Sequence, residues 1–260
     1  MLDANQLLGE AKKITGLSSL GNPLFEEGFN KLVYSINNEA DLNDIGIQAQ
    51  HHRLIGVLSN MLRIEDAVIN HPEILNEQIV APIVIVGLPR TGSTMTHRLL
   101  AADPRHTAML WWEGRYPAML PNEDRGNPSE RMALGKAEVD AVVAASPEAL
   151  TIHPWDYKGA DEEILLLEHT FFSTVPESFM RLPSYSSWVE DQDHIHAYNQ
   201  LKIMLQYLQW QNPGREKKRW VLKSPHHLGF IDKLLMVFPD SKVIQTHRDP
   251  QKTVPSFCSM

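Results

Sequence analysis

Cysteine is almost absent from this chain of 260 residues, since Cys258 is its only one. A single cysteine excludes an internal disulfide framework and favours a reducing compartment. Long hydrophobic runs are also lacking. The N-terminus has no apolar core of signal-peptide length, and no stretch approaches the ~20 residues of a membrane span. We therefore expect a globular, cytoplasmic protein.

The spacings typical of metal sites are missing as well. The sequence contains no H-E-x-x-H, C-x-x-C or EF-hand pattern, so we expect neither a structural nor a catalytic metal. The formal net charge of −8 argues against general binding of nucleic acid. Residues 213–252 differ from the rest of the chain in charge, because they contain nine Lys or Arg and only four Asp or Glu and therefore carry a local net positive charge.

The first candidate ligand motif follows an apolar run at residues 79–86, which predicts a strand buried in a parallel sheet. A glycine- and proline-containing loop comes next, and a helical pattern begins near Ser93 with Met95, Leu99 and Ala102 on one stripe. Such a strand, loop and helix form an anion cradle, because the first N–H groups of the helix have no partner within it. An ordinary βα turn with glycines for packing is the alternative.

Residues 87–94 read GLPRTGST and match the Walker A pattern G-x-x-x-x-G-K-[ST] except at the lysine, where Ser93 stands. An ATPase or kinase uses that lysine on the β- and γ-phosphates. Its absence argues against nucleoside triphosphate chemistry, but it does not argue against a phosphate-bearing ligand. Arg90 adds a fixed positive charge, and Gly92 lets the backbone approach an oxyanion. Further donors are the hydroxyls of Thr91, Ser93 and Thr94.

A second candidate motif lies near the end of the chain. Residues 241–244 predict a short buried strand, and the tripeptide RDP follows at residues 248–250. Arg248 presents a planar fork of donors that suits a phosphate, and Ser256 offers a hydroxyl. An arginine after a strand is commonly solvated or ion-paired, so this motif is weak when taken alone.

Together the two motifs resemble those of sulfotransferases that use 3′-phosphoadenosine 5′-phosphosulfate (PAPS), in the bacterial-type branch whose loop reads RTGST. The resemblance implies an α/β, P-loop-like three-layer fold with a central parallel sheet, preceded by a helical N-terminal region. It also implies that the first motif holds the 5′-phosphosulfate of the donor and the second holds its 3′-phosphate. The residues implied are Arg90, Thr91, Gly92, Ser93 and Thr94 in the first motif and Arg248 and Ser256 in the second.

Residues 1–76 show mostly helical periodicity, and no glycine-rich or charged linker separates them from the first strand. We expect a helical N-terminal cap or subdomain at residues 1–76 and a P-loop-like sulfotransferase domain at residues 77–260. Members of the family usually continue well beyond the 3′-phosphate motif, whereas this chain ends four residues after Ser256. We therefore expect the C-terminal part of the domain to be missing, which leaves the activity of this chain open.

The candidate catalytic residues lie between the two motifs. Residues 220–222 predict a third strand, and the resemblance extends to a K-x-P-x-H segment in its exit loop. We expect His227, and after it His226, to be the general base that takes the acceptor proton, with Lys223 as the electrophilic partner. A packing or surface role is the alternative for either histidine.

Two acidic clusters have simpler explanations than catalysis. Residues 161–172 read DEEILLLEHTFF and predict a helix whose first turn carries acids, which suits the helix dipole. Asp191 and Asp193 have the D-x-D spacing that glycosyltransferases use for a metal, but we expect them to cap the following helix. Reserve candidates for the general base are Glu162, Glu163 and Glu168.

The expected reaction is transfer of a sulfuryl group from PAPS to a hydroxyl or amine of a small-molecule, lipid or carbohydrate acceptor. Positioning and charge stabilisation dominate such a displacement, as they do in phosphoryl transfer. Two alternatives stay open. One is a P-loop kinase-like phosphotransferase that uses Arg90 in place of the lysine, and the other is a non-catalytic nucleotide-binding module.

Overall fold

The structure, a computed structural model, describes residues 1–259. The chain divides into two compact units. The first unit consists of Met1–Asn76 and Ile164–Met204, and the second consists of Glu77–Glu163 and Leu205–Met260. The helical character expected for the N-terminal region is confirmed, whereas the domain boundary placed after residue 76 stays a prediction.

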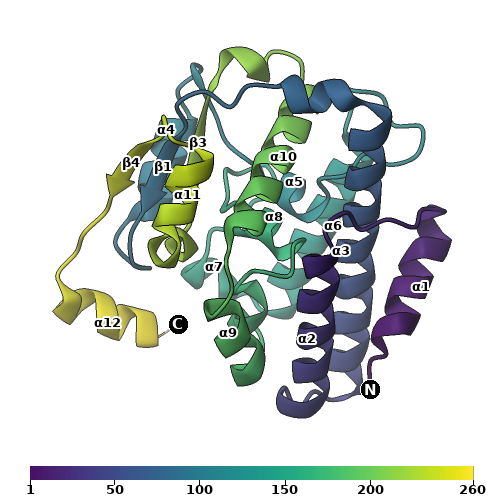
Figure 1. The fold of residues 1–260 in the computed structure, drawn as a ribbon. Helices are drawn as coiled ribbons and strands as arrows, with labels where there is room; N and C mark the ends of the chain where they lie inside the picture. The colour runs from purple at the N-terminus through teal and green to yellow at the C-terminus, as the bar shows by residue number, and fades with distance from the viewer. Residues whose placement is uncertain (260) are drawn as a thin grey trace. The chain divides into compact units, whose positions relative to one another are not determined.

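The first unit is built from helices. α1 packs along α3, and α2 packs against α9 (Figure 1). Asparagine or aspartate caps each of the first three helices, because the side chains of Asp3, Asn22 and Asn43 accept backbone N–H groups of the first turn. The helices of this unit are α1 (Ala4–Thr15), α2 (Pro23–Glu39), α3 (Asp44–Asn70), η1 (Pro72–Asn76), α8 (Ile164–Glu168), η2 (Val175–Ser178) and α9 (Pro183–Glu190).

The second unit contains a parallel sheet of four strands in the order β2-β3-β1-β4. All four residues of β1 are buried, and Ile83, Ile85 and Val221 form a core cluster against which Leu100 packs. A run that is apolar at every position is typical of a central parallel strand covered on both faces. The strands are β1 (Ile83–Val86), β2 (His106–Thr107), β3 (Arg219–Lys223) and β4 (Lys242–Gln245).

Helices lie on both faces of this sheet (Figure 1). The connection from β1 to β2 runs through α4 (Ser93–Ala101), and the connection from β3 to β4 runs through α11 (Ile231–Val237). The two connections cross the sheet in opposite directions. Because crossovers between parallel strands are right-handed, α4 and α11 belong to opposite faces. This three-layer arrangement confirms the predicted P-loop-like fold.

The remaining elements complete the second unit around the sheet. Trp111 and Trp112 are buried in a short helix. In the first unit, Asp193 accepts the backbone N–H of Ile195 at the start of α10, as predicted for a cap, whereas Asp191 lies at the C-terminal end of α9. These elements are α5 (Trp111–Arg115), α6 (Ser129–Ala145), α7 (Ala149–Ile152), η3 (Arg215–Lys217), η4 (Pro225–Gly229) and α12 (Pro250–Cys258), while α10 (Ile195–Gln211) contributes to both units.

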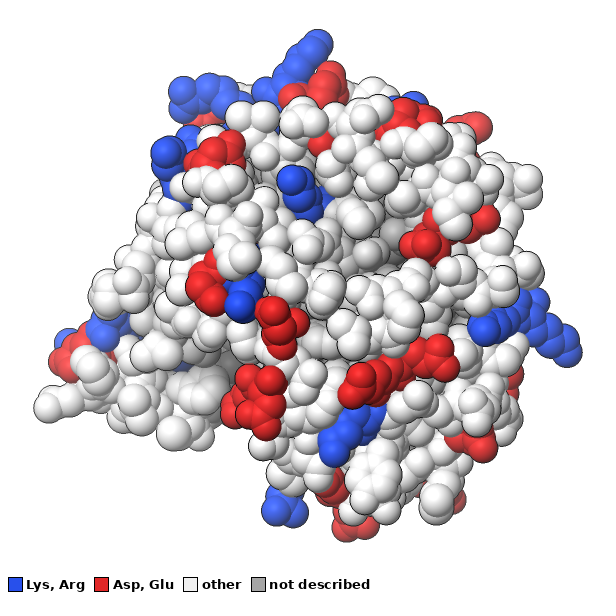
Figure 2. Space-filling model, viewed as in Figure 1, with Lys and Arg blue, Asp and Glu red and all other residues white. Residues whose placement is uncertain are grey.

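Two packing predictions were wrong. The strand at β4 was expected to be buried, but all four of its residues are exposed, because it is an edge strand. The α4 stripe of Met95 and Leu99 was expected to face the core, but both side chains are exposed, and Ser93 and His97 are buried instead. Figure 2 shows that the surface over α12, next to this edge, is mainly uncharged.

Membrane-spanning helices and clusters of metal-binding side chains are both absent from residues 1–259. Within that range, no helix is both long and apolar enough to cross a membrane. In the same range, the side chains of His, Cys, Asp and Glu form no group of three or more that could hold a metal ion.

Candidate active site

The predicted motifs follow the carboxyl ends of three neighbouring strands. The loop at residues 87–92 follows β1, the K-x-P-x-H segment begins at the end of β3, and Thr246 to Arg248 follow β4. In open sheets of this kind, ligands bind in the crevice outside the carboxyl ends of the strands. The order of the strands therefore brings all three segments to one edge of the sheet.

The loop after β1 depends on its glycines. Gly92 has a φ of 90°, a left-handed conformation that side chains other than glycine rarely adopt. A Cβ atom built on Gly87 would lie 2.2 Å from Oγ1 of Thr246, so β4 can approach this loop only because position 87 lacks a side chain. Arg90 is itself held at a φ of 69°. Strained residues of this kind are concentrated at functional sites.

Arg90 and Arg248 tie the two motifs together. Nε of Arg90 donates to Oγ of Ser256 over 3.2 Å, and Nη1 of Arg248 donates to the backbone carbonyl of Arg90 over 3.1 Å. Nη1 of Arg90 also donates to the carbonyl of Ile152 over 3.3 Å. Two segments that are more than 150 residues apart in the sequence therefore fix one guanidinium pair at one place.

A cavity of about 260 Å³ opens between the two motifs and is lined by Arg90, Gly92, Ser93, Thr94 and Arg248. No side chain caps the N-terminus of α4 at this cavity, so the first N–H groups of the helix point into the loop without a side-chain partner. Two arginines, uncapped N–H groups and a glycine backbone suit an oxyanion such as a phosphosulfate or a phosphate.

Two of the predicted donor-binding residues lie beside this cavity and do not line it. The hydroxyl of Thr91 donates to the carbonyl of Leu88 over 2.7 Å and lies 2.7 Å from Oγ1 of Thr246. Ser256 accepts from Arg90. In this arrangement Thr91 shapes the loop, while Ser256 orients an arginine of the cradle.

Lys223 lies at the end of β3, and its side chain is 2% exposed. Its Nζ donates to Oγ1 of Thr94 over 3.2 Å and forms a close ion pair with Glu162. Thr94 belongs to the first turn of α4 and lines the cradle cavity. The predicted electrophile is thus in contact with the predicted donor site.

His227 and Glu163 form a buried pair behind Lys223. Nε2 of His227 lies 2.5 Å from Oε1 of Glu163, and the two side chains are 0% and 1% exposed. The other carboxyl oxygen of Glu163 accepts the backbone N–H of Lys223 over 2.8 Å. Glu163 therefore fixes both the histidine and the end of the strand that carries the lysine.

His226, the second predicted base, is turned to a different environment. It is buried, and the centre of its ring lies 4.8 Å from that of the Phe230 ring.

A further histidine, His97 on α4, was not predicted from the sequence. Its Nε2 lies 3.2 Å from the backbone carbonyl of Val221. Burial lowers the pKa of His97, which favours its neutral form.

The acidic cluster was wrongly assigned to the first turn of a helix. α8 begins only at Ile164, and the preceding residues pass beside the sheet. Asp161 bonds to His153 over 2.8 Å, Glu162 to Lys223, and Glu163 to His227. The sequence signal that was available was the run of three acids itself, which complements the basic K-x-P-x-H segment.

The pKa values of the carboxyl groups in this cluster are shifted in different directions. Burial raises the pKa of Glu162, although the neighbouring Lys223 opposes that shift. Burial also acts to raise the pKa of Glu163, but the hydrogen bond and charge of His227 outweigh it and hold the pKa below its usual value. The pKa of Asp161 is likewise held below its usual value, because the hydrogen bond and charge of His153 outweigh the effect of burial. Glu168, the third reserve candidate, belongs to the first unit and pairs with Arg53.

Curated relatives match the chain over 199 residues with 29% identity. They are the omega-hydroxy-beta-dihydromenaquinone-9 sulfotransferases Stf3 of Mycobacterium bovis and Mycobacterium tuberculosis. The matched region covers 69% of this chain and 45% of each relative, so the match spans less than half the length of those proteins.

Solved structures agree with this similarity. Sulfotransferase STF1 from Mycobacterium tuberculosis superposes with a TM-score of 0.80 and 29% identity, covering 99% of this chain and 70% of that one. Sulfotransferase STF9 from Mycobacterium avium superposes with a TM-score of 0.85 and 28% identity, covering 100% of this chain and 66% of that one. The sequence model described as the Sulfotransferase family matches residues 82–260. The chain therefore belongs to the sulfotransferase family.

Proposed function

We propose that this protein transfers a sulfuryl group from PAPS to the hydroxyl of a small organic acceptor. The observation that carries the proposal is the junction of Arg90, Arg248 and Ser256 around a cavity at the N-terminus of α4. Two arginines from two motifs provide two positive charges, which suits a donor that carries both a phosphosulfate and a phosphate. When bound, the donor supplies the sulfuryl group and a phosphate leaving group.

In the proposed mechanism, Lys223 stabilises charge on the leaving group. Its Nζ lies 3.2 Å from Oγ1 of Thr94, next to the proposed position of the phosphosulfate. Preorganised donors in a buried site stabilise developing charge because they need no reorganisation during the reaction. Lys223 is 2% exposed and is held by Thr94 and Glu162, so its ammonium group meets this requirement.

We assign the general base to Glu162 and a positioning role to His227. The side chain of Glu162 is 21% exposed and adjoins Lys223, whereas that of His227 is fully buried against Glu163. A base must come within hydrogen-bond reach of the acceptor proton. The raised pKa of Glu162 brings its basicity closer to neutral pH, which favours proton transfer. His227 remains the competing candidate, and His226 follows it.

The acceptor class is suggested by the relatives. Stf3 is named for a hydroxylated menaquinone, so we propose a hydroxyl-bearing, lipid-like molecule as the first acceptor to examine. A hydroxyl needs a base and no metal for this displacement. The cytoplasm, where PAPS would be supplied, is the proposed compartment.

Calorimetric titration with adenosine 3′,5′-bisphosphate, the product of the donor, tests the first step of this proposal, with ATP as the competing ligand. Tight binding of the bisphosphate and weak binding of ATP are expected. Preference for ATP would instead favour the kinase-like alternative. Binding of the bisphosphate without transfer to any hydroxylated prenyl lipid would favour the non-catalytic module.

A further inference from the structure

A second cavity, of about 400 Å³, lies in the same unit as the cradle but shares no lining residue with it. It is formed at the C-terminal end of α4, whereas the cradle is formed at the N-terminal end. With a rise of about 1.5 Å per residue, the nine residues of α4 separate the two ends by roughly 12 Å. The second cavity is therefore distinct from the cradle cavity.

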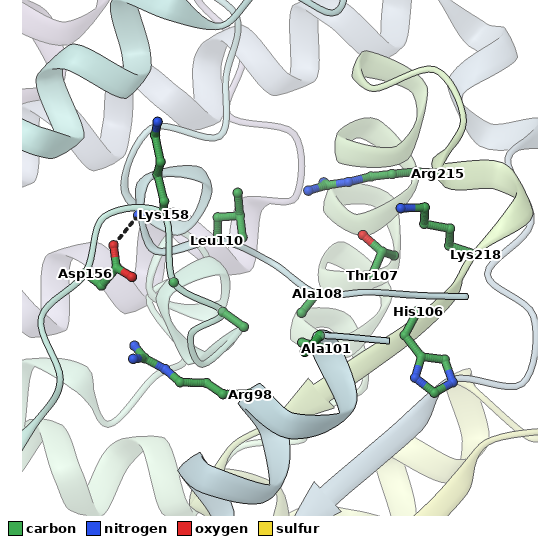
Figure 3. Close-up of a pocket in the computed structure, with 13 residues that line it drawn as sticks. Arg98, Ala101, His106, Thr107, Ala108, Leu110, Asp156, Lys158, Arg215 and Lys218 are labelled. Atoms are coloured by element: carbon green, nitrogen blue, oxygen red, sulfur yellow. Dashed lines mark hydrogen bonds between the residues drawn. The ribbon is translucent and has the colours of Figure 1, made fainter. Parts of the chain in front are cut away.

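The walls of this cavity carry mainly positive charge. Arg98, Lys158, Arg215 and Lys218 line it together with a single acid, Asp156. The side chains of Arg215 and Lys218 extend toward the loop that carries Asp156 and Lys158 (Figure 3). The chain as a whole has a net charge of −8, so the charge of this cavity is opposite in sign to the net charge of the chain.

Not all of this charge is available to a ligand. Arg215 forms two contacts, of 2.9 and 3.0 Å, with the buried carboxylate of Glu113, which neutralises it. Lys158 and Lys218, by contrast, form no ion pair with any described residue. Oδ1 of Asp156 accepts the backbone N–H of Lys158 over 3.0 Å. The two lysines and Arg98 thus leave the cavity with an excess of positive charge.

Arg98 is fixed in position for such a role. Its Nη2 donates to the carbonyl of Pro154 over 2.9 Å, and its guanidinium packs so closely on Gly159 that a Cβ atom there would lie 2.7 Å from Nη2. Nε of Arg98 is buried and has no hydrogen-bond partner among residues 1–259. An arginine held by one edge and open at another is preorganised to bind an oxyanion.

The rest of the lining is small and mainly apolar. Ala101, Ala102, Ala108, Leu110 and Ala160 contribute to the wall, and Figure 3 labels Ala101, Ala108 and Leu110 among them. The volume is within the usual range of small-molecule sites, which combine apolar walls with a few polar groups. Positive side chains together with alanines and a leucine suit a ligand that combines an anionic group with a small organic body.

We propose that this cavity binds a small organic phosphate or sulfate ester. Arg98 would hold the oxyanion, Lys158 and Lys218 would add positive charge around the cavity, and the alanines would contact the organic group. The proposal is independent of the donor assignment, because the two cavities share no lining residue.

Site-resolved NMR titration distinguishes the two sites. The backbone amides of Thr107 and Gly159 report on this cavity, and those of Gly92 and Ser93 report on the cradle. Phenyl phosphate and phenyl sulfate are the probes, with inorganic phosphate for comparison. We expect saturable shifts at the first pair of amides, with at least one ester binding more tightly than inorganic phosphate. The preferred ester identifies the class of ligand.

A double variant, Lys158→Gln with Lys218→Gln, tests the charge. Loss of two surface charges should raise the dissociation constant about five- to tenfold at this cavity. Lys217→Gln is the matched control, since Lys217 is exposed, adjacent to Lys218 and not part of the lining. Absence of saturable shifts at Thr107 and Gly159, or equal affinity in the double variant and the control, would overturn the proposal. Shifts at Gly92 and Ser93 bear only on the donor site.

Discussion

Nε of Arg90 donates to Oγ of Ser256 over 3.2 Å, although the two residues are 166 positions apart. One belongs to the loop after β1, and the other belongs to α12. Each motif is weak alone, because a glycine loop or an R-D-P tripeptide occurs in many settings. The contact makes them parts of one site, and it explains why the guanidinium of Arg90 has a fixed direction.

Replacing either arginine should weaken binding of adenosine 3′,5′-bisphosphate. Hydrogen bonds to charged groups contribute about 1.5–3 kcal/mol, so Arg90→Ala and Arg248→Ala should each raise the dissociation constant about ten- to hundredfold. Calorimetric titration measures this effect. Arg105→Ala is the control, because the side chain of Arg105 is 82% exposed and, among residues 1–259, pairs only with Asp103. Unchanged affinity in both Arg90→Ala and Arg248→Ala would contradict the assignment of these arginines to donor binding.

Glu162→Gln should preserve binding of the bisphosphate and reduce kcat about 10²- to 10⁴-fold, which is the usual contribution of a general base. His227→Gln should bind the bisphosphate equally well and lose less turnover than Glu162→Gln, because it acts through Glu163. Single-turnover kinetics on both variants distinguishes the two candidates. Full activity of Glu162→Gln together with loss of turnover in His227→Gln would instead identify His227 as the general base.

The pH dependence of kcat gives an independent test of the same base. Glu162 accepts a proton only when ionised, so kcat should fall as the pH decreases through its pKa. Because burial raises that pKa, the acid limb should lie above the ~4.3 of an ordinary glutamate. A profile that stays flat down to pH 4.5 would exclude Glu162 as the base.

The buried Glu163–His227 pair should contribute to folding stability. Removing one partner of a buried ion pair costs about 3–5 kcal/mol, so Glu163→Ala should lower the free energy of unfolding by that order. The folded pKa of Glu163 is depressed, so its contribution is complete above the unfolded value of about 4.3 and is lost as the pH falls through the folded value. Urea denaturation at pH 7 and at successively lower pH measures both effects. Equal acid sensitivity of Glu163→Gln and the parent chain would contradict this role.

Gly87→Ala should damage the cradle without changing any charge. The added Cβ atom would lie 2.2 Å from Oγ1 and 2.8 Å from the backbone oxygen of Thr246, so the loop and β4 must separate. A cost of about 1–3 kcal/mol in unfolding free energy and weaker binding of the bisphosphate are expected. Gly9→Ala on α1 is the control, since no heavy atom lies within 4 Å of its Cβ position. That variant should be neutral or stabilising by up to about 1 kcal/mol. Equal stability of the two variants would mean that β4 does not depend on the close approach.

Part of the candidate site followed from the sequence alone. The apolar run before Gly87, the glycine spacing and the start of a helix at Ser93 are local features, and the structure has a strand, loop and helix there, although the strand covers only Ile83–Val86 of the predicted 79–86. Local features also located Lys223 and His227 at the exit of a strand, because an apolar run ends at Leu222. Their catalytic and donor-binding roles stay predictions.

Burial and partnership were decided only by tertiary structure. The three acids from Asp161 to Glu163 suit a helix start by local rules, yet they pair with His153, Lys223 and His227, and no local pattern encodes those contacts. The exposure of Met95 and Leu99 is likewise a consequence of which elements neighbour α4. Periodicity tells which residues share a face of a helix, but only the packing of distant segments decides which face is covered and which charges meet.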